Sequence, residues 1–312
     1  MSTATLATPS LKQSDPERRH KRLVRLASVL AITLVVSLLI QGFSYYTLPL
    51  RERPHSPQHD ALKPSGTIGV KLGIFGAVLF GLIFIYPIRK KWMWLQRKGN
   101  SKHWLDFHII MGLTAPWIIA CHASFKFQGF AGLAFFIMTA VAVSGIVGRY
   151  LYNQIPRRLN SSELSMQEAR DLQNHLIAEL SAQKYFEPEQ LRPLFRLPTE
   201  QQAQQMPAIV TLLYMAYLDV QRPFHVARLR IRSLSFIEFF TTFGGFLHTR
   251  HAEVEIVIDL ARAQATLSKR IIFLSRAQHI FHLWHVIHRP FSFSFVILAL
   301  IHISVVTLLG FA

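Results

Sequence analysis

Four histidines lie in two pairs that share one spacing. His108 precedes His122 by fourteen residues in one apolar stretch, and His288 precedes His302 by fourteen in another. Fourteen residues of α-helix rise roughly 21 Å and return to within about 40° of the same face. Each pair therefore predicts two imidazoles on one helix face, at two depths. If the two helices run parallel, His108 meets His288 and His122 meets His302. A single metal ion could not reach all four, so the spacing predicts two separate bis-imidazole sites.

The composition indicates a membrane protein. Of the 312 residues, 51% are hydrophobic and 24 are Phe, a balance typical of chains with several membrane helices. The net charge of +17 flanks the apolar runs instead of forming a separate basic module, so we interpret it as a determinant of topology and expect no nucleic-acid partner. Cys121 is the one cysteine, which excludes intrachain disulfides, an iron–sulfur cluster held by this chain and covalent haem attachment through CxxCH.

The hydropathy pattern predicts an all-α membrane bundle of about five transmembrane helices with a helical cytoplasmic insert between the fourth and fifth spans. A cleaved signal peptide is the weaker interpretation of the first run, because a long polar tail precedes it. Gly69, Gly73 and Gly76 share about one face of the second run, which favours close helix packing over a groove for a cofactor. The expected parts are a basic tail (1–22), four spans (23–154), the insert (155–282) and the final span (283–312).

Within the insert, Glu163 to Gln183 has the pattern of an amphipathic helix. The segments Ile209 to Val220 and Leu234 to Leu247 are too short for a full crossing. We expect them to lie on the membrane face or to pack in a small cytoplasmic domain, with a re-entrant pair as the alternative. From Glu253 the pattern predicts an unbroken helix up to Pro290, which is expected to kink it.

The distribution of basic residues predicts the orientation. The tail before Leu23, the loop from Arg89 to Lys102 and the segment around Arg157 are basic, so they are expected in the cytoplasm. The chain is then a multi-pass protein of a bacterial-type inner (cytoplasmic) membrane with its N-terminus in the cytoplasm. The third and fifth spans both run outward, which makes the two histidine helices parallel by an argument independent of their spacing.

These histidines suit haem. Ionisable residues inside a membrane are rare and usually functional, and imidazole binds haem iron. Two axial imidazoles leave no open position on the iron, which favours electron transfer over ligand activation. We therefore expect two non-covalent haem b groups, with His108, His122, His288 and His302 as iron ligands. The candidate partners of the haem propionates are Arg149, Arg289 and Arg276 inside, and Arg51, Arg53 or Lys126 outside.

Other residues near these four leave alternatives open. His285 lies seventeen residues before His302, about 100° away around the helix, so His288 is preferred as the ligand. His279, His282 and His285 are expected to line the membrane surface, or a quinone or proton path. Gly112, one turn after His108, either admits a porphyrin or serves helix packing. Three further residues are expected to be structural or on the surface: Cys121 as a small buried side chain, and His248 and His251 as surface residues.

At these residues the chain resembles the transmembrane di-haem cytochrome b proteins, which include respiratory cytochrome b subunits and the ferric-reductase-like membrane domain. The matching elements are His108 with His122, and the stretch from Trp284 to Pro290 with His302. The resemblance covers the membrane portion only, and the polar insert departs from the compact four-helix cytochromes. The insert has no Gly-rich dinucleotide fingerprint, so the resemblance implies a partner that supplies electrons.

The expected function is an electron-transfer subunit of an oxidoreductase complex, which carries electrons between a cytoplasmic or quinone-side donor and an external acceptor. The expected partners are membrane lipid and redox protein subunits, with quinone as a further candidate. A transporter or metal permease with a histidine-lined path is one rival. It predicts acidic partners inside the membrane, for which Asp106 is the clear candidate. A membrane-anchored scaffold, which would bind no chromophore, is the second.

Overall fold

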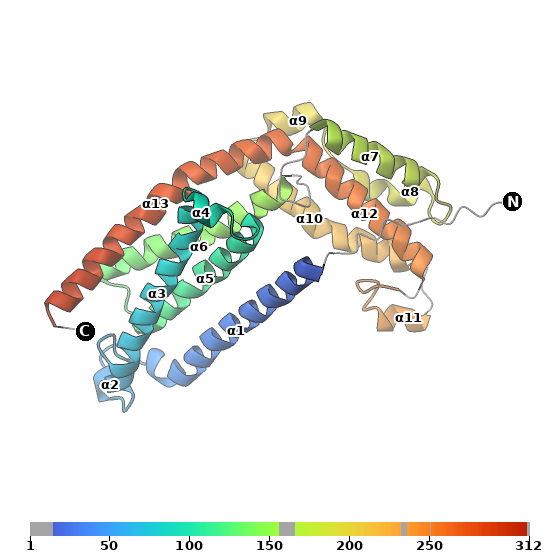
Figure 1. Ribbon diagram of the computed structural model, residues 1–312. Helices are drawn as coiled ribbons and strands as arrows, with labels where there is room; N and C mark the ends of the chain where they lie inside the picture. Colours follow the sequence, from blue (N-terminus) through green and yellow to red (C-terminus); the bar gives the residue numbers. More distant parts are fainter. Residues whose placement is uncertain (1–14, 156–165, 232–235, 250, 311–312) are drawn as a thin grey trace. The chain divides into compact units, whose positions relative to one another are not determined.

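The computed structural model describes residues 15–155, 166–231, 236–249 and 251–310, and the regular elements in these ranges are all helical (Figure 1). Within these ranges, five helices are long and apolar enough to cross a membrane, as the sequence predicts. The chain divides into two compact units, one made of Met1–Ile146 and Ile287–Ala312 and the other of Val147–Val286. The divisions fall inside two long helices, α6 (Gly129–Gln154) and α13 (Leu274–Leu308).

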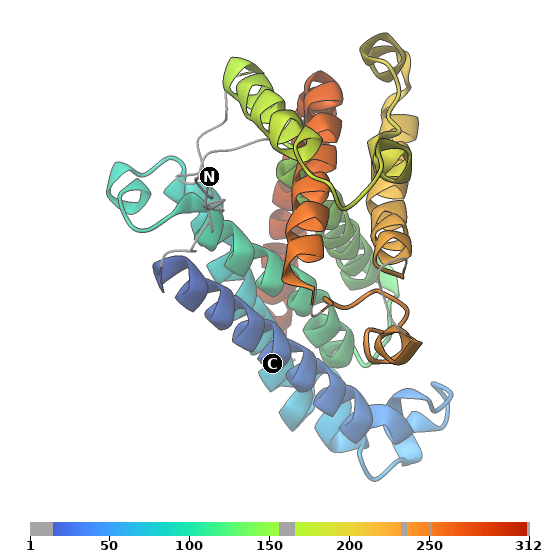
Figure 2. The same cartoon turned by 90° about the vertical axis from the view of Figure 1, so that its right-hand side faces the viewer.

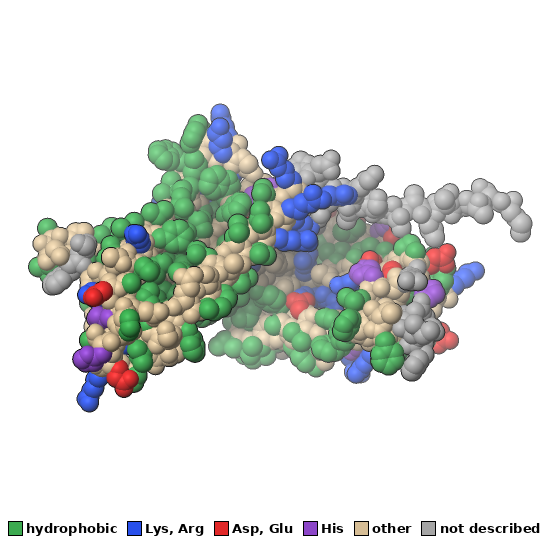
Figure 3. Space-filling view, turned by 90° about the horizontal axis from the view of Figure 1, so that it is seen from below, with side chains coloured by type: hydrophobic (Ala, Val, Ile, Leu, Met, Phe, Trp, Pro, Cys, Tyr) green, Lys and Arg blue, Asp and Glu red, His purple; other side chains and the backbone are tan. Residues whose placement is uncertain are grey.

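The first unit contains α1 (Asp15–Tyr46), α3 (Thr67–Arg89) and α5 (Ser101–His122), with most of α6 and α13. Many large apolar side chains on these helices point outward; Ile40 is 70% exposed and Leu300 is 58% exposed. Hydrophobic side chains cover much of this part of the surface in Figure 3. Such a surface suits lipid and not water, because large apolar patches are rare on soluble proteins.

Helix α1 begins at Asp15, several residues before the predicted start at Leu23, so part of the basic tail is helical; residues 1–14 lie outside the described ranges. Contacts with the start of α5 hold this extension. The Glu17 carboxylate accepts a hydrogen bond from Lys102 Nζ (2.7 Å), and His20 Nε2 lies 3.0 Å from Asp106 Oδ2. The extension therefore belongs to the packing of α1 against α5.

The relative directions of three helices follow from their contacts. His108 and His122 of α5 contact Ile83 and Gly69 of α3 respectively, so α3 and α5 are antiparallel. Between α3 and α13, Phe80 packs on Phe295 and Phe84 packs on Phe293, so this pair is also antiparallel. Helices α5 and α13 are therefore parallel, as Figure 1 shows and as the sequence predicts.

The second unit is built around α12 (Ala252–Ile272), with α7 (Met166–Ser181) and α10 (Ala208–Ile231) on either side of it (Figure 2). Helix α7 falls within the predicted amphipathic segment; residues 163–165 of that segment lie outside the described ranges. The apolar positions of α12 recur every three or four residues, so they form one stripe that enters the core, led by Val257, Ile258 and Ala261.

The prediction of an unbroken helix from Glu253 to Pro290 was wrong. Helix α12 ends at Ile272, and α13 begins at Leu274. The fully buried Phe273 marks the break; it packs in a second apolar cluster with Leu151 and Met215. The break follows from this tertiary contact, because no Gly or Pro stands there to signal it.

The two short apolar segments of the insert have different structures. Ile209 to Val220 belongs to α10, whose Met215, Val226 and Leu229 enter the cores of the second unit, so it packs in this compact unit. The other segment contains α11 (Phe236–Thr241) and a turn through Phe243, Gly244 and Gly245 with positive φ; residues 234 and 235 lie outside the described ranges.

Minor helices connect these elements. They are η1 (Arg53–His55), α2 (His59–Leu62), α4 (Met93–Gln96), α8 (Pro188–Leu191), η2 (Arg192–Phe195) and α9 (Glu200–Gln205).

Candidate functional site

The rings of His122 and His302 lie in a T-shaped arrangement in the first unit, and we call these two residues the contact pair. Their ring centroids are 6.5 Å apart and the ring planes make an angle of 70°. His122 Nδ1 donates a hydrogen bond to the Gly69 carbonyl at 2.8 Å. A carbonyl only accepts, so the proton is on Nδ1 and the lone pair of Nε2 is available to a metal.

The His122 ring packs against α3 at Gly73, where the lack of a side chain leaves room for the imidazole. A Cβ atom built on Gly73 would lie 2.8 Å from Cε1 of the imidazole, closer than side chains tolerate. One turn further along, a Cβ atom on Gly76 would lie 2.3 Å from Ile119. The glycines thus allow α3 and α5 to approach closely, in agreement with the packing role predicted from their common face.

The turn after α5 fixes the position of His122 along the helix axis. Ser124 and Phe125 both have positive φ, which ends α5. Ser124 Oγ donates to the Leu62 carbonyl (2.5 Å), and the Ser124 carbonyl accepts from the buried Arg53. Arg53 also donates to two carbonyls at the end of α1, those of Tyr46, the last residue of the helix (2.7 Å), and of Leu48 (3.0 Å). Arg53 therefore links the end of α1 to the turn after α5 through three carbonyls, and its role as a propionate partner stays a prediction.

The His108 ring is anchored by the Ile83 carbonyl, which has no helical hydrogen-bond donor because residue 87 is a proline. His108 Nδ1 lies 3.0 Å from the oxygen of Ile83. In a regular helix this oxygen would accept from the N–H four residues later, but that residue is Pro87, which has none. The free acceptor therefore points across to α5, and His108 donates to it through Nδ1. The Tyr86 ring lies 5.2 Å from the imidazole.

Ser144 of α6 anchors His288. Ser144 Oγ donates its one proton to the Val141 carbonyl (2.8 Å) and lies 2.8 Å from His288 Nδ1. Because the hydroxyl proton is used within α6, the bond to the imidazole requires a proton on Nδ1. His288 is thus a third candidate ligand whose Nε2 is left without a proton.

His108 and His288 form the separated pair. Among the described residues, the ring contact of His108 is with Tyr86 and not with His288. Helices α5 and α13 are parallel and His122 meets His302, so the common spacing places the separated pair at one height, roughly 21 Å along the bundle from the contact pair. The structure brings together one of the two predicted pairs and places the other at matching depth.

The neighbouring histidines have other environments. His285 Nδ1 bonds to the Phe281 carbonyl of its own helix at 2.9 Å, and its ring packs on Phe281 and Trp284. His279 and His282 are exposed on α13. Two further predictions are confirmed: Cys121 is buried, and His248 and His251 are exposed.

The predicted propionate partners near the separated pair lie in different units. Arg289, one residue after His288, is exposed on α13 in the first unit. Arg149 belongs to the second unit and lies 5.7 Å from the Tyr152 ring in a cation–π contact. Arg276, also in the second unit, donates to the Met206 carbonyl (2.6 Å). Arg51 and Lys126, the remaining outer candidates, are exposed.

The donor set of the histidines fits haem. Among the described residues, no three His, Cys, Asp or Glu side chains converge to hold a bare metal ion. A haem iron needs only two ligands from the protein, because the porphyrin supplies the others. A metal bound at about 2 Å by two imidazoles on opposite sides separates their centroids by roughly 6 Å, which agrees with the contact pair. A Cβ atom on Gly112 would meet no heavy atom within 4 Å, so helix packing does not explain this glycine.

Sequence reasoning missed the groups that anchor the imidazoles, which are Gly69, Ile83 and Ser144. One of them had a local signal, since a proline inside an apolar helix frees the carbonyl four residues before it. The others depend on the register between helices, which no single segment contains.

The comparisons with known proteins give no relative. No protein family, curated protein or solved structure matches the chain.

Proposed function

We propose that this chain is a membrane electron-transfer protein that holds two b-type haems, one between His122 and His302 and one between His108 and His288. The observation that carries the proposal is the anchoring of three of these imidazoles through Nδ1, by Gly69, Ile83 and Ser144. Haem-ligating and metal-ligating histidines are typically held in this way, because the bond fixes the tautomer and the ring orientation. The 6.5 Å distance between the ring centroids of the contact pair adds support.

The arrangement suits electron transfer more than catalysis at iron. A haem with two axial imidazoles exchanges single electrons and offers no open position to oxygen or substrate. Here the chain's own residues orient the imidazoles through Nδ1, and apolar α3 and α13 side chains such as Phe80 and Phe295 pack between the two depths. Two centres at two depths give a path along the bundle axis.

The proposed setting is a bacterial-type inner membrane with the N-terminus in the cytoplasm. Basic side chains precede the first span and follow α3, which supports a cytoplasmic position for the N-terminal tail and for the loop after α3. The separated pair then lies near the cytoplasm and the contact pair near the outside. The proposed partners are a redox subunit that delivers or takes electrons, lipid around the apolar helices, and a quinone near His279, His282 and His285.

An absorption spectrum tests the proposal. Protein purified after expression with iron and a haem precursor should show a b-type spectrum that dithionite reduces, with about two haems per chain by pyridine haemochrome assay. Protein that remains colourless under these conditions would eliminate the haem proposal and favour the scaffold. A colourless protein that moves metal ions into vesicles would favour the permease.

A further inference from the structure

A partly buried ionic network joins α6, α10 and α12 in the second unit. Asp219 Oδ1 accepts a hydrogen bond from Lys269 Nζ (2.5 Å), and Oδ2 accepts bonds from Tyr150 (2.8 Å) and Gln154 (3.3 Å). Lys269 is 1% exposed, so its ammonium group depends on Asp219 for compensation. Both oxygens of this carboxylate are therefore already in use.

The network has more positive than negative charge. Arg222 reaches Asp219 Oδ1 only at 3.5 Å, because Lys269 occupies that oxygen. Arg270 also lies within electrostatic reach of Asp219, and its Nε is buried without a hydrogen-bond partner among the described residues. Burial lowers the pKa of Lys269 to about 8, in spite of the bond to Asp219. A cluster of this kind is stabilised by an additional anion.

Arg222 also borders a cavity. Hydrogen bonds to Thr266 Oγ1 (2.9 Å) and to the Ala265 carbonyl (3.3 Å) hold its guanidinium group in place. The cavity has a volume of about 280 Å³, near the lower end of the roughly 300–1,000 Å³ typical of small-molecule sites. It is lined by Pro193, Leu194, Arg196, Leu197, Tyr214, Tyr217, Leu218, Gln221, Arg222 and His225.

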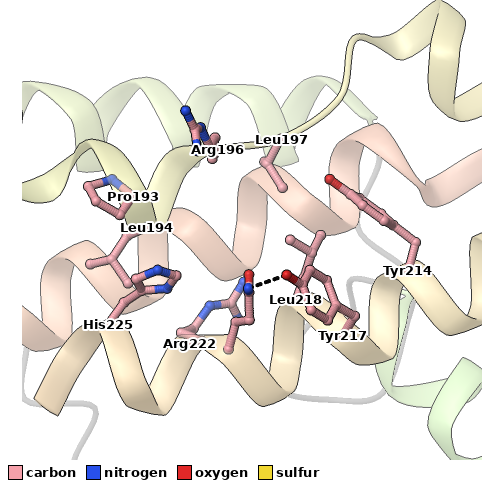
Figure 4. A pocket seen from close by; sticks show the side chains of 10 residues that line it. Pro193, Leu194, Arg196, Leu197, Tyr214, Tyr217, Leu218, Arg222 and His225 are labelled. Carbon is pink, nitrogen blue, oxygen red and sulfur yellow. Dashed lines mark hydrogen bonds between the residues drawn. The ribbon is translucent and has the colours of Figure 1, made fainter. Parts of the chain in front are cut away.

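The lining has two chemically different ends. In Figure 4, Arg222 and His225 lie toward one end and the rings of Tyr214 and Tyr217 toward the other. Arg196, on the rim, is exposed and adds a second guanidinium group. A cationic end matches an oxyanion, because guanidinium donates charge-assisted bonds to carboxylate and phosphate. An aromatic end matches a flat ring.

We propose that this cavity binds a small organic anion, a phosphate or carboxylate group carried on a flat ring. The oxyanion group pairs with Arg222 and supplies the negative charge that Asp219 alone does not provide. The ring packs against the side of Tyr214 and Tyr217, whose own ring centroids are 6.3 Å apart, and His225 donates a hydrogen bond to the oxyanion. The volume of the cavity accommodates one ring with one charged group.

Isothermal titration calorimetry on the full chain in detergent tests the proposal, with phenyl phosphate, benzoate, inorganic phosphate and phenol as probes. Phenyl phosphate or benzoate should bind saturably and more tightly than inorganic phosphate, and phenol should not bind. The phosphate and carboxylate probes distinguish the two oxyanions. Arg222→Gln should weaken binding by about tenfold or more, since it removes a charge-assisted bond.

Arg170→Gln is the matched control, because it removes an exposed cation from the same unit outside the cavity. It should change the affinity by less than about twofold, since salt screens exposed charges. Circular dichroism checks that each variant is folded. If Arg222→Gln does not fold, Tyr214→Leu serves as the test variant. It should lower the affinity for the ring-bearing probes but not for inorganic phosphate. No saturable binding of either ring-bearing anion, or equal affinity in folded wild type and Arg222→Gln, would overturn the proposal.

Discussion

The contact pair and the separated pair have the same spacing but depend on different parts of the bundle. In the contact pair, His122 is fixed by α3 and by the turn after α5, and its ring already meets His302. In the separated pair, α3 anchors His108 and α6 anchors His288, so the two imidazoles belong to two helix pairs, α3–α5 and α6–α13. The distance between the two imidazoles of the separated pair therefore depends on how far apart the two helix pairs lie. In the contact pair, this distance is set by the contact between the two rings.

Replacement of one of the four proposed ligands should have the largest effect on haem content, and it should distinguish the two pairs. We expect His122→Ala or His302→Ala to lose one haem of the two, and His108→Ala or His288→Ala to lose the other, because a single imidazole binds haem much more weakly than two. Haem content per chain and low-temperature spectra measure the loss. His285→Ala is the control and should keep both haems, since its ring packs on Phe281 and Trp284. Loss of a haem in that variant, with both kept in His288→Ala, would assign the ligand to His285.

Gly73→Ala should disturb the contact pair alone. The new Cβ atom would lie 2.8 Å from the His122 ring, so the imidazole or α3 must move, at a cost of about 1–3 kcal/mol. We expect reduced occupancy of one haem and a lower melting temperature. Gly81→Ala is the matched control on the same helix, because no heavy atom lies within 4 Å of its Cβ position. Equal behaviour of the two variants would show that close packing at Gly73 does not position the ring.

Ser144→Ala should weaken the separated pair without removing a ligand. His288 Nδ1 would lose its acceptor, and loss of such a partner typically costs about 10- to 100-fold in metal affinity. Haem titration of protein depleted of cofactor measures the change at one of the two sites. Thr139→Val is the control, since Thr139 lies on the same helix and its hydroxyl donates to the Phe135 carbonyl of that helix, away from the histidines. An unchanged titration curve in Ser144→Ala would remove Ser144 from the site.

Pro87→Ala should have the smallest effect. It adds an N–H that competes with His108 for the Ile83 carbonyl, so the bond to Nδ1 weakens and the imidazole becomes a poorer electron donor. The midpoint potential of one haem should rise while the other stays constant, as measured by spectroelectrochemistry. A shift of equal size at both haems would mean that the substitution acts through the whole bundle.

The sequence was sufficient to predict the five apolar helices and the parallel direction of the two histidine helices. These features rest on local hydropathy and on charge in short loops, which each segment carries by itself. It did not predict the start of α1 at Asp15 or the break at Phe273, because both depend on contacts between segments distant in the chain. The anchors at Gly69 and Ser144 were missed for the same reason.

The order of synthesis gives a further role to the Gly69 and Ile83 carbonyls of α3, which anchor the two histidines of α5. His122 precedes His302 by 180 residues, and His108 precedes His288 by the same number. At about 5–20 residues per second, each first imidazole waits roughly 10–40 s for its counterpart to leave the ribosome. During that interval the bonds to Gly69 and Ile83 satisfy one polar atom of each ring, which lipid alone could not do. In the proposed di-haem protein, each iron can gain its second imidazole only after α13 has been made, in a bundle where α3 already holds the two α5 histidines.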